Sequence, residues 1–396
     1  MRQQISDSNV ICVAGKGTPV YIYNKQIVAE RAIEMRRVFQ GYKLYYSVKA
    51  NPHPEICSTL AERGFQAEVV SPGELQIALN AGFAAKEILF AGPGKSREDI
   101  NFAIENGVGL FTVESILQAE LIESVAAIYK VQVNVLLRVK DSRLHQNIGE
   151  SMVSPESQFG LDVDSFLDGM STLRSLRYIR IIGTQCYSCS QVLDPSRLAL
   201  SVSHQIKLTR LLEKDLGTKL DTLDIGGGFG VPYRTIDKKL DLERCAALVG
   251  MAIGEQYNPS NILVETGRYV TAPAGVFVCR IVDVKQSMGR AFIICDGGFS
   301  GFSRPVLVGP VHKIHHIPLK PREKTKKYPK REYIVCGSSC SSIDVLGKGF
   351  FESPQVDDLI KISHAGAYGY SMSIHSFHSR RPPREVVFDN IHGDFG

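Results

Sequence analysis

A lysine in the segment YYSVKAN (45–51) is the first residue whose surroundings suggest chemistry. Lys49 ends an apolar run that is typical of a β-strand, where a charged side chain is unusual. Partial burial lowers the pKa of an ammonium group and leaves a neutral amine that can form a Schiff base. The same position suits a lysine whose head group reaches solvent from the strand end, so this segment alone does not separate the two interpretations.

Consecutive glycines follow a predicted strand in LDIGGGFGVPY (223–233). Glycines let backbone N–H groups approach a phosphate closely, although a tight turn before a helix explains the same pattern. A dinucleotide-binding fingerprint is excluded, because Val231 stands where its third glycine is required.

The segment VETGRY (264–269) places a carboxylate at another strand end. Glu265 could hydrogen-bond a protonated ring nitrogen of a cofactor, and Gly267 with Arg268 could meet phosphate. A plain Glu–Arg ion pair is the alternative interpretation. Three later segments combine glycines with an arginine, a thiol or a tyrosine, and each is a weak signal alone: CDGGFSGFSRP (295–305), CGSSCSSIDVLGKG (336–349) and HAGAYGYSMS (364–373).

These residues need elements that bring them together. From about residue 30 to 270, short β-branched runs alternate with helical patterns, as in KLYYSVKAN followed by PEICSTLAERG. About eight such strands predict parallel βα units closed into a barrel, whose strand ends face one site. After residue 271, strands separated by turns predict a mostly antiparallel β domain, and TPVYIYN predicts a strand before the barrel.

Composition narrows the class of protein further. The chain has 396 residues, of which 44% are hydrophobic and 22% charged, with a net charge of +5. These values predict a globular protein of two domains and give no indication of nucleic-acid binding. We expect no signal peptide and no membrane span, and nine scattered cysteines predict free thiols in the cytoplasm.

Taken in order, these motifs resemble the group IV (fold type III) decarboxylases that use pyridoxal 5'-phosphate (PLP), such as the diaminopimelate, ornithine and arginine decarboxylases. The resemblance covers almost the whole chain. It implies an alanine-racemase-like (β/α)8 barrel that binds PLP (30–270) and a β domain formed by 1–29 and 271–396. It also implies a homodimer whose active sites are shared between one subunit's barrel and the partner's β domain.

The resemblance also assigns roles to individual residues. Lys49 matches the Schiff-base lysine, and Glu265 the partner of the pyridine nitrogen. Arg304 matches the arginine that binds the substrate carboxylate, and Cys340 matches a thiol donated across the dimer interface as a general acid. The residues that match the binding site of the PLP phosphate are Ser190, Gly227, Gly228, Gly267, Arg268 and Tyr368. In the Cys340 segment, Ser341 and Asp344 match positions that contact the substrate.

Two positions depart from the family pattern. Decarboxylases of basic amino acids usually have an acidic residue after the cysteine, to pair with the distal ammonium; here the residue is Ser341. A buried ammonium without its partner is costly, which argues against diaminopimelate, ornithine and lysine as substrates. In GTQCYSCSQ (183–191), Tyr187 stands where a histidine usually stacks on the PLP ring, and a tyrosine can stack there too.

Together these departures resemble the branch of the family in specialised metabolism. That branch decarboxylates glutamyl groups held by an acyl carrier protein, or citryl–diaminopropionate conjugates in siderophore pathways. A basic segment, LKPREKTKKYPKRE (319–332), could steer an acidic carrier protein through residues such as Lys326 and Lys327. A solvated loop is the alternative, and we expect charge reversal there to separate the two.

Several other patterns predict no separate site. AGPGKS (91–96) lacks the first glycine of a P-loop, because Leu89 stands there. Cys186 and Cys189 have no second pair at zinc-ribbon spacing, and the histidines of HKIHH (312–316) have no added carboxylate, so no metal is expected.

The sequence therefore predicts a PLP-dependent α-decarboxylase of an acylated, conjugated or carrier-bound amino acid. A decarboxylase of diaminopimelate or another free diamino acid is the first alternative. An amino-acid racemase is the second, although racemases place a second base, usually a tyrosine, where this chain has Cys340.

Overall fold

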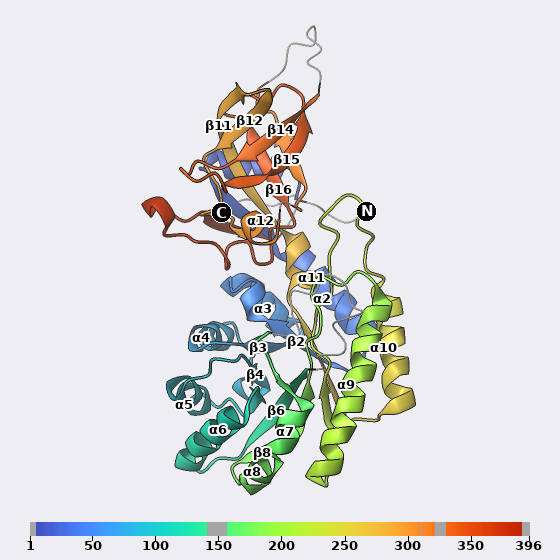
Figure 1. Cartoon of the computed structure of the whole chain (residues 1–396). Helices are drawn as coiled ribbons and strands as arrows, with labels where there is room; N and C mark the ends of the chain where they lie inside the picture. Colours follow the sequence, from blue (N-terminus) through green and yellow to red (C-terminus); the bar gives the residue numbers. More distant parts are fainter. Residues whose placement is uncertain (1–4, 141–156, 310, 321–329, 390–396) are drawn as a thin grey trace. The chain divides into compact units, whose positions relative to one another are not determined.

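The computed structural model describes residues 5–140, 157–309, 311–320 and 330–389 (Figure 1). By its internal contacts the chain divides into two compact units. The barrel unit comprises Arg31–Val231 and Lys238–Gly267, and the β unit comprises Met1–Glu30, Pro232–Asp237 and Arg268–Gly396. The domain ranges expected from the sequence do not separate Pro232–Asp237, which falls with the β unit.

Eight parallel strands close into the barrel that the sequence predicts. Their order around the barrel is β5-β4-β3-β2-β10-β9-β8-β6, and the pairing of β5 with β6 closes the sheet. A short strand, β7 (Leu161–Asp162), pairs in parallel with the end of β6. The bounds of the eight are β2 Lys43–Ser47, β3 Gln66–Val69, β4 Ile88–Phe90, β5 Leu110–Val113, β6 Val133–Lys140, β8 Ile179–Gln185, β9 Thr222–Asp224 and β10 Asn261–Thr266.

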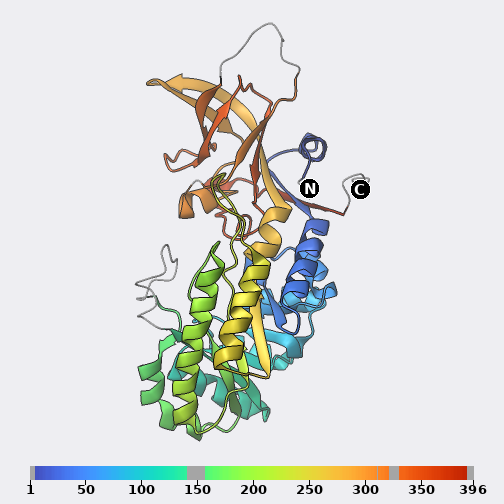
Figure 2. The same ribbon diagram turned by 90° about the vertical axis from the view of Figure 1, so that its right-hand side faces the viewer.

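Helices cover the outside of this sheet, and α9 and α10 lie side by side in both views (Figures 1 and 2). Several helices begin at a side chain that accepts a backbone N–H of the first turn, as Ser71, Ser96 and Ser115 do, and such caps fix where each helix starts. The helices are α2 Lys25–Val38, α3 Pro54–Glu62, α4 Pro72–Asn80, α5 Arg97–Glu105, α6 Ile116–Tyr129, α7 Val163–Asp168, α8 Met170–Ser175, α9 Pro195–Leu216 and α10 Leu242–Gln256.

The β unit is built on one mostly antiparallel sheet, as predicted. Its strand order is β13-β16-β11-β12-β14-β15, with β1 paired to β11 and β17 paired to β1. The pairs β12–β14 and β1–β17 are parallel. The strands are β1 Val20–Asn24, β11 Gly275–Ser287, β12 Arg290–Cys295, β13 Ile314–Ile317, β14 Arg331–Cys336, β15 Val345–Phe351, β16 Leu359–Ser363 and β17 Arg384–Phe388.

Three helices complete the β unit: α1 (Asp7–Gly15), α11 (Arg268–Thr271) and α12 (Arg304–Val308). The buried side of α1 packs with β1, β11 and β16 in one apolar core, through residues such as Val10 and Val13. Across the described ranges, no helix combines the length and apolar character needed to cross a membrane.

Candidate active site

Lys49 lies directly after β2, in a single 3-10 turn formed by Val48–Ala50. Its Nζ atom donates to both carboxylate oxygens of Glu68, at 2.6 and 2.5 Å. The Glu68 side chain is 3% exposed and the Lys49 side chain is 39% exposed. The amine therefore stands at the carboxyl end of the barrel, held by an acid at the end of the neighbouring strand β3.

Two more acids are buried at the ends of β9 and β10. Glu265 accepts a hydrogen bond from Gln185 Nε2 at 3.1 Å, and Asp224 Oδ1 accepts from the N–H of Gly226 at 2.9 Å. Burial raises the pKa of Glu265, and the neighbouring Glu68 raises it further, while Lys49 lowers it. The Glu265 carboxyl thus lies in a place that favours a cationic hydrogen-bond donor.

A further buried lysine belongs to the same end of the barrel. Lys95 Nζ donates to the carbonyl of Gly92 at 2.6 Å and lies 3.3 Å from both Thr112 Oγ1 and Gln118 Oε1. Burial lowers its pKa from 10.5 to about 7, although Glu114 opposes the shift. AGPGKS thus places a buried lysine in the loop between β4 and α5.

Arg138, on β6, pairs with Glu114 at 2.9 Å. The other carboxylate oxygen of Glu114 accepts from the N–H of Gly160, also at 2.9 Å. This arginine lies over the ring of Phe159, with its guanidinium carbon 4.9 Å from the ring centre. Glu114 and Arg138 together thus contact Phe159 and Gly160.

The glycines after β9 pack closely against neighbouring strand ends. A Cβ atom on Gly226 would lie 2.4 Å from the carbonyl of Cys186, and one on Gly227 would lie 2.5 Å from the carbonyl of Glu265. At Gly228 the obstacle would be the carbonyl of Cys189, at 2.4 Å. Only glycine therefore allows the turns after β8, β9 and β10 to approach one another.

Those turns carry the phosphate and ring-stacking residues predicted from the sequence. Tyr187 and Ser190 follow β8 and are half-buried. Val192 donates its N–H to the carbonyl of Gly228, which joins this segment to the glycine turn. Gly267 follows β10, and a Cβ there would lie 2.7 Å from the Cβ of Ala50, beside Lys49. The barrel unit thus brings together Lys49, Tyr187, Ser190, Gly227, Gly228, Glu265 and Gly267.

The remaining predicted residues lie in the β unit, where two buried arginines share one aromatic partner. Arg268 Nη1 donates to the hydroxyl of Tyr233 at 3.0 Å, and its guanidinium lies 4.8 Å from the ring centre of Tyr368. Arg304 lies 4.9 Å from the ring centre of Tyr233. Burial lowers the pKa of Arg304, and its Nε atom has no hydrogen-bond partner among the described residues.

His312 packs against the same group and is 6% exposed. Its ring centre is 4.7 Å from that of Tyr233, and its Nδ1 atom lies 2.9 Å from the carbonyl of Ser363. Burial lowers the pKa of His312 from 6.5 to about 3, so the ring is neutral at ordinary pH. Two cations therefore stand beside an uncharged histidine.

Cys340 is exposed on the loop between β14 and β15, with its Sγ atom 3.9 Å from Nε2 of His378. Asp344 shapes that loop. Its Oδ1 atom accepts from the N–H of Phe299 at 2.7 Å and its Oδ2 atom from the N–H of Ser339 at 3.0 Å. Asp344 is 3% exposed, and both carboxylate oxygens bind backbone.

Comparison with known proteins identifies the family. The profile described as "Pyridoxal-dependent decarboxylase, pyridoxal binding domain" matches residues 25–272. The chain belongs to this family. It is therefore a PLP-dependent decarboxylase, a carboxy-lyase with PLP as its cofactor.

Relatives and solved structures of this decarboxylase cover nearly its full length. It is 29% identical to L-glutamyl-[BtrI acyl-carrier protein] decarboxylase of Niallia circulans, over 94% of this chain and 89% of that protein. It is 32% identical to the diaminopimelate decarboxylase of Campylobacter jejuni, over 90% of this chain and 87% of that protein. The crystal structure of diaminopimelate decarboxylase from M. jannaschii in co-complex with L-lysine matches with a TM-score of 0.86 at 27% identity. The match covers 96% of this chain and 89% of that chain.

The residues of the decarboxylase's barrel fit PLP chemically. An amine, Lys49, and a buried acid, Glu265, are available for the aldehyde and the ring nitrogen. The neighbouring turns contain glycines at which a Cβ atom would come within 2.4–2.7 Å of adjacent atoms. The buried atoms Gln185 Oε1 and Asp224 Oδ2 have no hydrogen-bond partner among the described residues, which indicates room for further polar contacts beside Glu265.

Sequence reasoning missed several charged residues of this site, namely Glu68, Lys95, Glu114, Arg138 and Asp224. A signal was available for Asp224, because it comes directly before the glycines of LDIGGGFGVPY, at the end of a predicted strand. The basic residues Lys326 and Lys327 lie outside the described residues. The described part of the chain contains no group of three or more His, Cys, Asp or Glu residues that could hold a metal.

Proposed function

We propose that this enzyme removes the α-carboxylate of an amino acid whose side chain is acylated, conjugated or bound to a carrier protein, in specialised metabolism. The observation that carries the proposal is the chemistry of the Cys340 loop. Position 341, next to the thiol, is a serine. The loop's one carboxylate, on Asp344, is engaged by two backbone N–H groups.

A free diamino acid would bring a distal ammonium to this loop. Burying an ammonium without an anionic partner costs several kcal/mol. Because Asp344 is occupied, we propose that it holds the loop in shape and that Ser341 meets an uncharged substrate group, such as an amide or a thioester. The relative from Niallia circulans, whose name specifies a glutamyl group on a carrier protein, supports this substrate class.

The barrel residues supply the cofactor's binding groups in this proposal. PLP, when bound, takes up the electrons released as the bond to the carboxylate breaks. Lys49 holds the cofactor through its amine, and Glu68 positions that amine at 2.6 Å. Glu265 would accept a hydrogen bond from the protonated ring nitrogen, and Tyr187 would stack on the ring.

Phosphate binding and proton transfer complete the proposed roles. Ser190, Gly227 and Gly228 present donors to the phosphate together with Gly267, Arg268 and Tyr368. Arg304 binds the substrate carboxylate, for which its unpartnered Nε atom leaves a donor available. Cys340 Sγ donates the proton that replaces CO2 on the α-carbon. We propose that a homodimer shares these groups, with Cys340 reaching the partner's barrel.

The second candidate function is decarboxylation of free diaminopimelate. Its support is similarity, because the diaminopimelate decarboxylase of Campylobacter jejuni is as similar overall as the relative that acts on a carrier-bound group. A free diamino acid needs an acidic residue at position 341, whereas an acylated or tethered substrate does not. One panel of substrates therefore separates the two candidates.

The test is decarboxylation read by mass spectrometry as loss of one CO2. The panel holds free diaminopimelate, ornithine, lysine and arginine beside glutamyl carrier proteins and citryl–amino acid conjugates. We expect turnover of the tethered or conjugated substrates alone, and we expect Ser341→Asp to lose that turnover while gaining measurable activity on a free diamino acid. Turnover of a free diamino acid by the wild-type enzyme would overturn the proposed substrate class.

The role of Lys49 has a separate test. Lys49→Ala should remove the visible absorbance of bound PLP and abolish turnover, because no other amine replaces its covalent bond. Lys43→Ala, at the opposite end of the same strand, is the matched control and should keep both. A Lys49→Ala protein with full activity would refute the assignment.

A further inference from the structure

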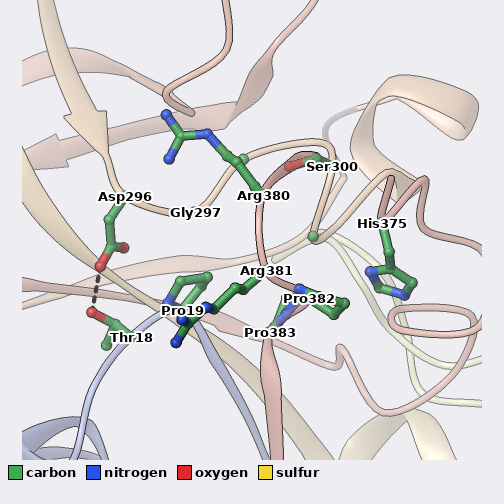
Figure 3. Close-up of a pocket in the computed structure, with 12 residues that line it drawn as sticks. Thr18, Pro19, Asp296, Gly297, Ser300, His375, Arg380, Arg381, Pro382 and Pro383 are labelled. Atoms are coloured by element: carbon green, nitrogen blue, oxygen red, sulfur yellow. Dashed lines mark hydrogen bonds between the residues drawn. The ribbon is translucent and has the colours of Figure 1, made fainter. Parts of the chain in front are cut away.

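A pocket of about 230 Å³ lies wholly within the β unit (Figure 3). No role is assigned to it by the reaction described above. Its wall is formed by the N-terminal approach to β1, by the glycine-rich turn after β12 and by the segment before β17. The lining residues are Thr18, Pro19, Asp296, Gly297, Gly298, Ser300, Gly301, His375, Arg380, Arg381, Pro382 and Pro383.

The turn after β12 lines this pocket with residues whose backbone N–H groups lack a partner among the described residues. The N–H groups of Gly297, Gly298 and Ser300 make no hydrogen bond to any described part of the chain. Gly297 and Gly298 are buried, so their N–H groups are not simply solvated at the surface. Successive backbone N–H groups without acceptors form a concavity that suits an anion.

Two arginines add charge to these donors. Figure 3 shows Arg380 and Arg381 leaving the backbone in different directions at the pocket. The Arg381 side chain is exposed and makes no hydrogen bond or ion pair with the described residues. His375 also lines the pocket, and its buried Nδ1 atom has no partner in the described ranges.

The pocket contains one described carboxylate, Asp296, which opposes an anion. Its two oxygens are already engaged, because Oδ2 accepts from the hydroxyl of Thr18 at 2.5 Å and Oδ1 accepts from the N–H of Arg280 at 2.8 Å. With Arg380 and Arg381 on the same wall, the formal charge of the lining is positive. The carboxylate oxygens of Asp296 are therefore engaged within the protein, and the net charge of the lining favours an anion.

Hydrogen bonds connect this pocket to the loop that carries Cys340. Arg380 Nη2 donates to the carbonyl of Ser338 at 3.2 Å, and the hydroxyl of Ser338 donates to the carbonyl of Asp296 at 3.3 Å. The next residue of the loop, Ser339, donates its N–H to Asp344, which also accepts from the N–H of Phe299 in the turn after β12. A ligand in the pocket would lie beside the loop of the proposed general acid.

We propose that this pocket is an anion subsite that takes the phosphodiester of a carrier protein's phosphopantetheine arm. The proposal rests on the proposed function, because only a carrier-bound substrate brings such an arm. Arg381 supplies a cation that has no partner among the described residues, and Gly297, Gly298 and Ser300 supply the backbone donors. The subsite selects tethered substrates over free amino acids, which lack the phosphate.

The direct test is calorimetric binding to the PLP-loaded enzyme, in which the cofactor's own phosphate residues are filled. The probes are 4'-phosphopantetheine, pantetheine and inorganic phosphate. We expect 4'-phosphopantetheine to bind tightest, and Arg381→Gln to weaken it about tenfold, the effect of losing one charge-assisted hydrogen bond. Arg290→Gln is the matched control, because Arg290 is also exposed, begins β12 and does not line the pocket.

The calorimetric results can overturn the proposed subsite in two ways. Equal affinity for pantetheine and 4'-phosphopantetheine, or a preference that survives Arg381→Gln, overturns the subsite. Inorganic phosphate binding as tightly as 4'-phosphopantetheine overturns its assignment to a carrier arm. Failure of the proposed function is seen separately, as absence of CO2 loss from every glutamyl carrier protein in the substrate panel, whatever the calorimetry shows.

Discussion

Charged side chains at the mouth of the barrel neutralise one another in pairs. Lys49 faces Glu68 across two adjacent strands, and Arg138 faces Glu114. Lys95 differs from these, because the three groups around its Nζ atom are a carbonyl, a hydroxyl and an amide oxygen. Its protonation therefore depends on burial more than on a partner, and the fold carries a lysine that is readily neutral.

This yields a prediction about stability and pH. The pKa of Lys95 is about 7 in the folded protein, against an ordinary value of 10.5. Between these values the unfolded chain binds a proton that the folded chain does not, so stability rises with pH across that window and falls as pH drops toward 7. Lys95→Met removes this contribution. We expect the free energy of unfolding of wild type, relative to Lys95→Met, to rise from pH about 7 to about 9.5.

Urea titrations of the two proteins at several pH values measure that difference. Lys86→Met, in the 3-10 turn before β4, provides a control at an exposed lysine. A difference between wild type and Lys95→Met that stays flat across the window, or that falls, would show that Lys95 is protonated in the folded protein.

Turns between strands and helices decide how closely the strand ends meet. Gly227 lies where a Cβ atom would come within 2.5 Å of the backbone carbonyl of Glu265, which cannot move without shifting β10. Gly227→Ala should therefore lower the free energy of unfolding of the barrel by about 1–3 kcal/mol. The same substitution should also weaken PLP binding. Gly254→Ala, in α10, has open space at its Cβ and should be neutral or stabilising by about 0.4–1 kcal/mol.

Thermal unfolding with and without added PLP checks this prediction. If Gly227→Ala and Gly254→Ala change stability and PLP affinity equally, the close approach at Gly227 has no special role. A loss of PLP affinity at Gly227 without a loss of stability would place the effect on the cofactor alone.

Elements with local signals could be predicted, whereas those that depend on distant partners could not. PEICSTLAERG contains its own proline start and glycine end, and α3 occupies Pro54–Glu62. The helix α1, by contrast, is stabilised mainly by burial against β1, β11 and β16. The strand β17 exists through parallel pairing with β1, from the opposite end of the chain. Neither was expected, because their periodicity is short and their partners are remote.

The candidate site also contains features that could be predicted from the sequence and features that could not. Lys49 and Glu265 were expected because charged residues at barrel strand ends face the site. The engagement of Asp344 by the N–H groups of Phe299 and Ser339 could not be predicted, since it requires two loops to meet in three dimensions. The same is true of Tyr233, whose ring contacts both Arg268 and Arg304 from a segment that reads as part of the barrel.

At the scale of the whole molecule, the proposed catalytic groups are divided between units. Lys49 belongs to the barrel unit and Cys340 to the β unit. If a homodimer pairs one subunit's barrel with the partner's β domain, each active site needs Lys49 from one chain and Cys340 from the other. A dimer of one Lys49→Ala chain and one Cys340→Ala chain would then hold one site with both residues and one site with neither.

Mixing the two impaired variants under conditions of subunit exchange should therefore restore activity. Random exchange makes about half of the dimers mixed, each with one intact site, so the expected recovery is about a quarter of wild-type turnover. Lys49→Ala mixed with the double variant Lys49→Ala/Cys340→Ala is the control and should gain nothing, because no dimer then contains an intact lysine. If exchange is demonstrated by mass spectrometry and activity does not rise above the average of the two parents, both residues act within one chain.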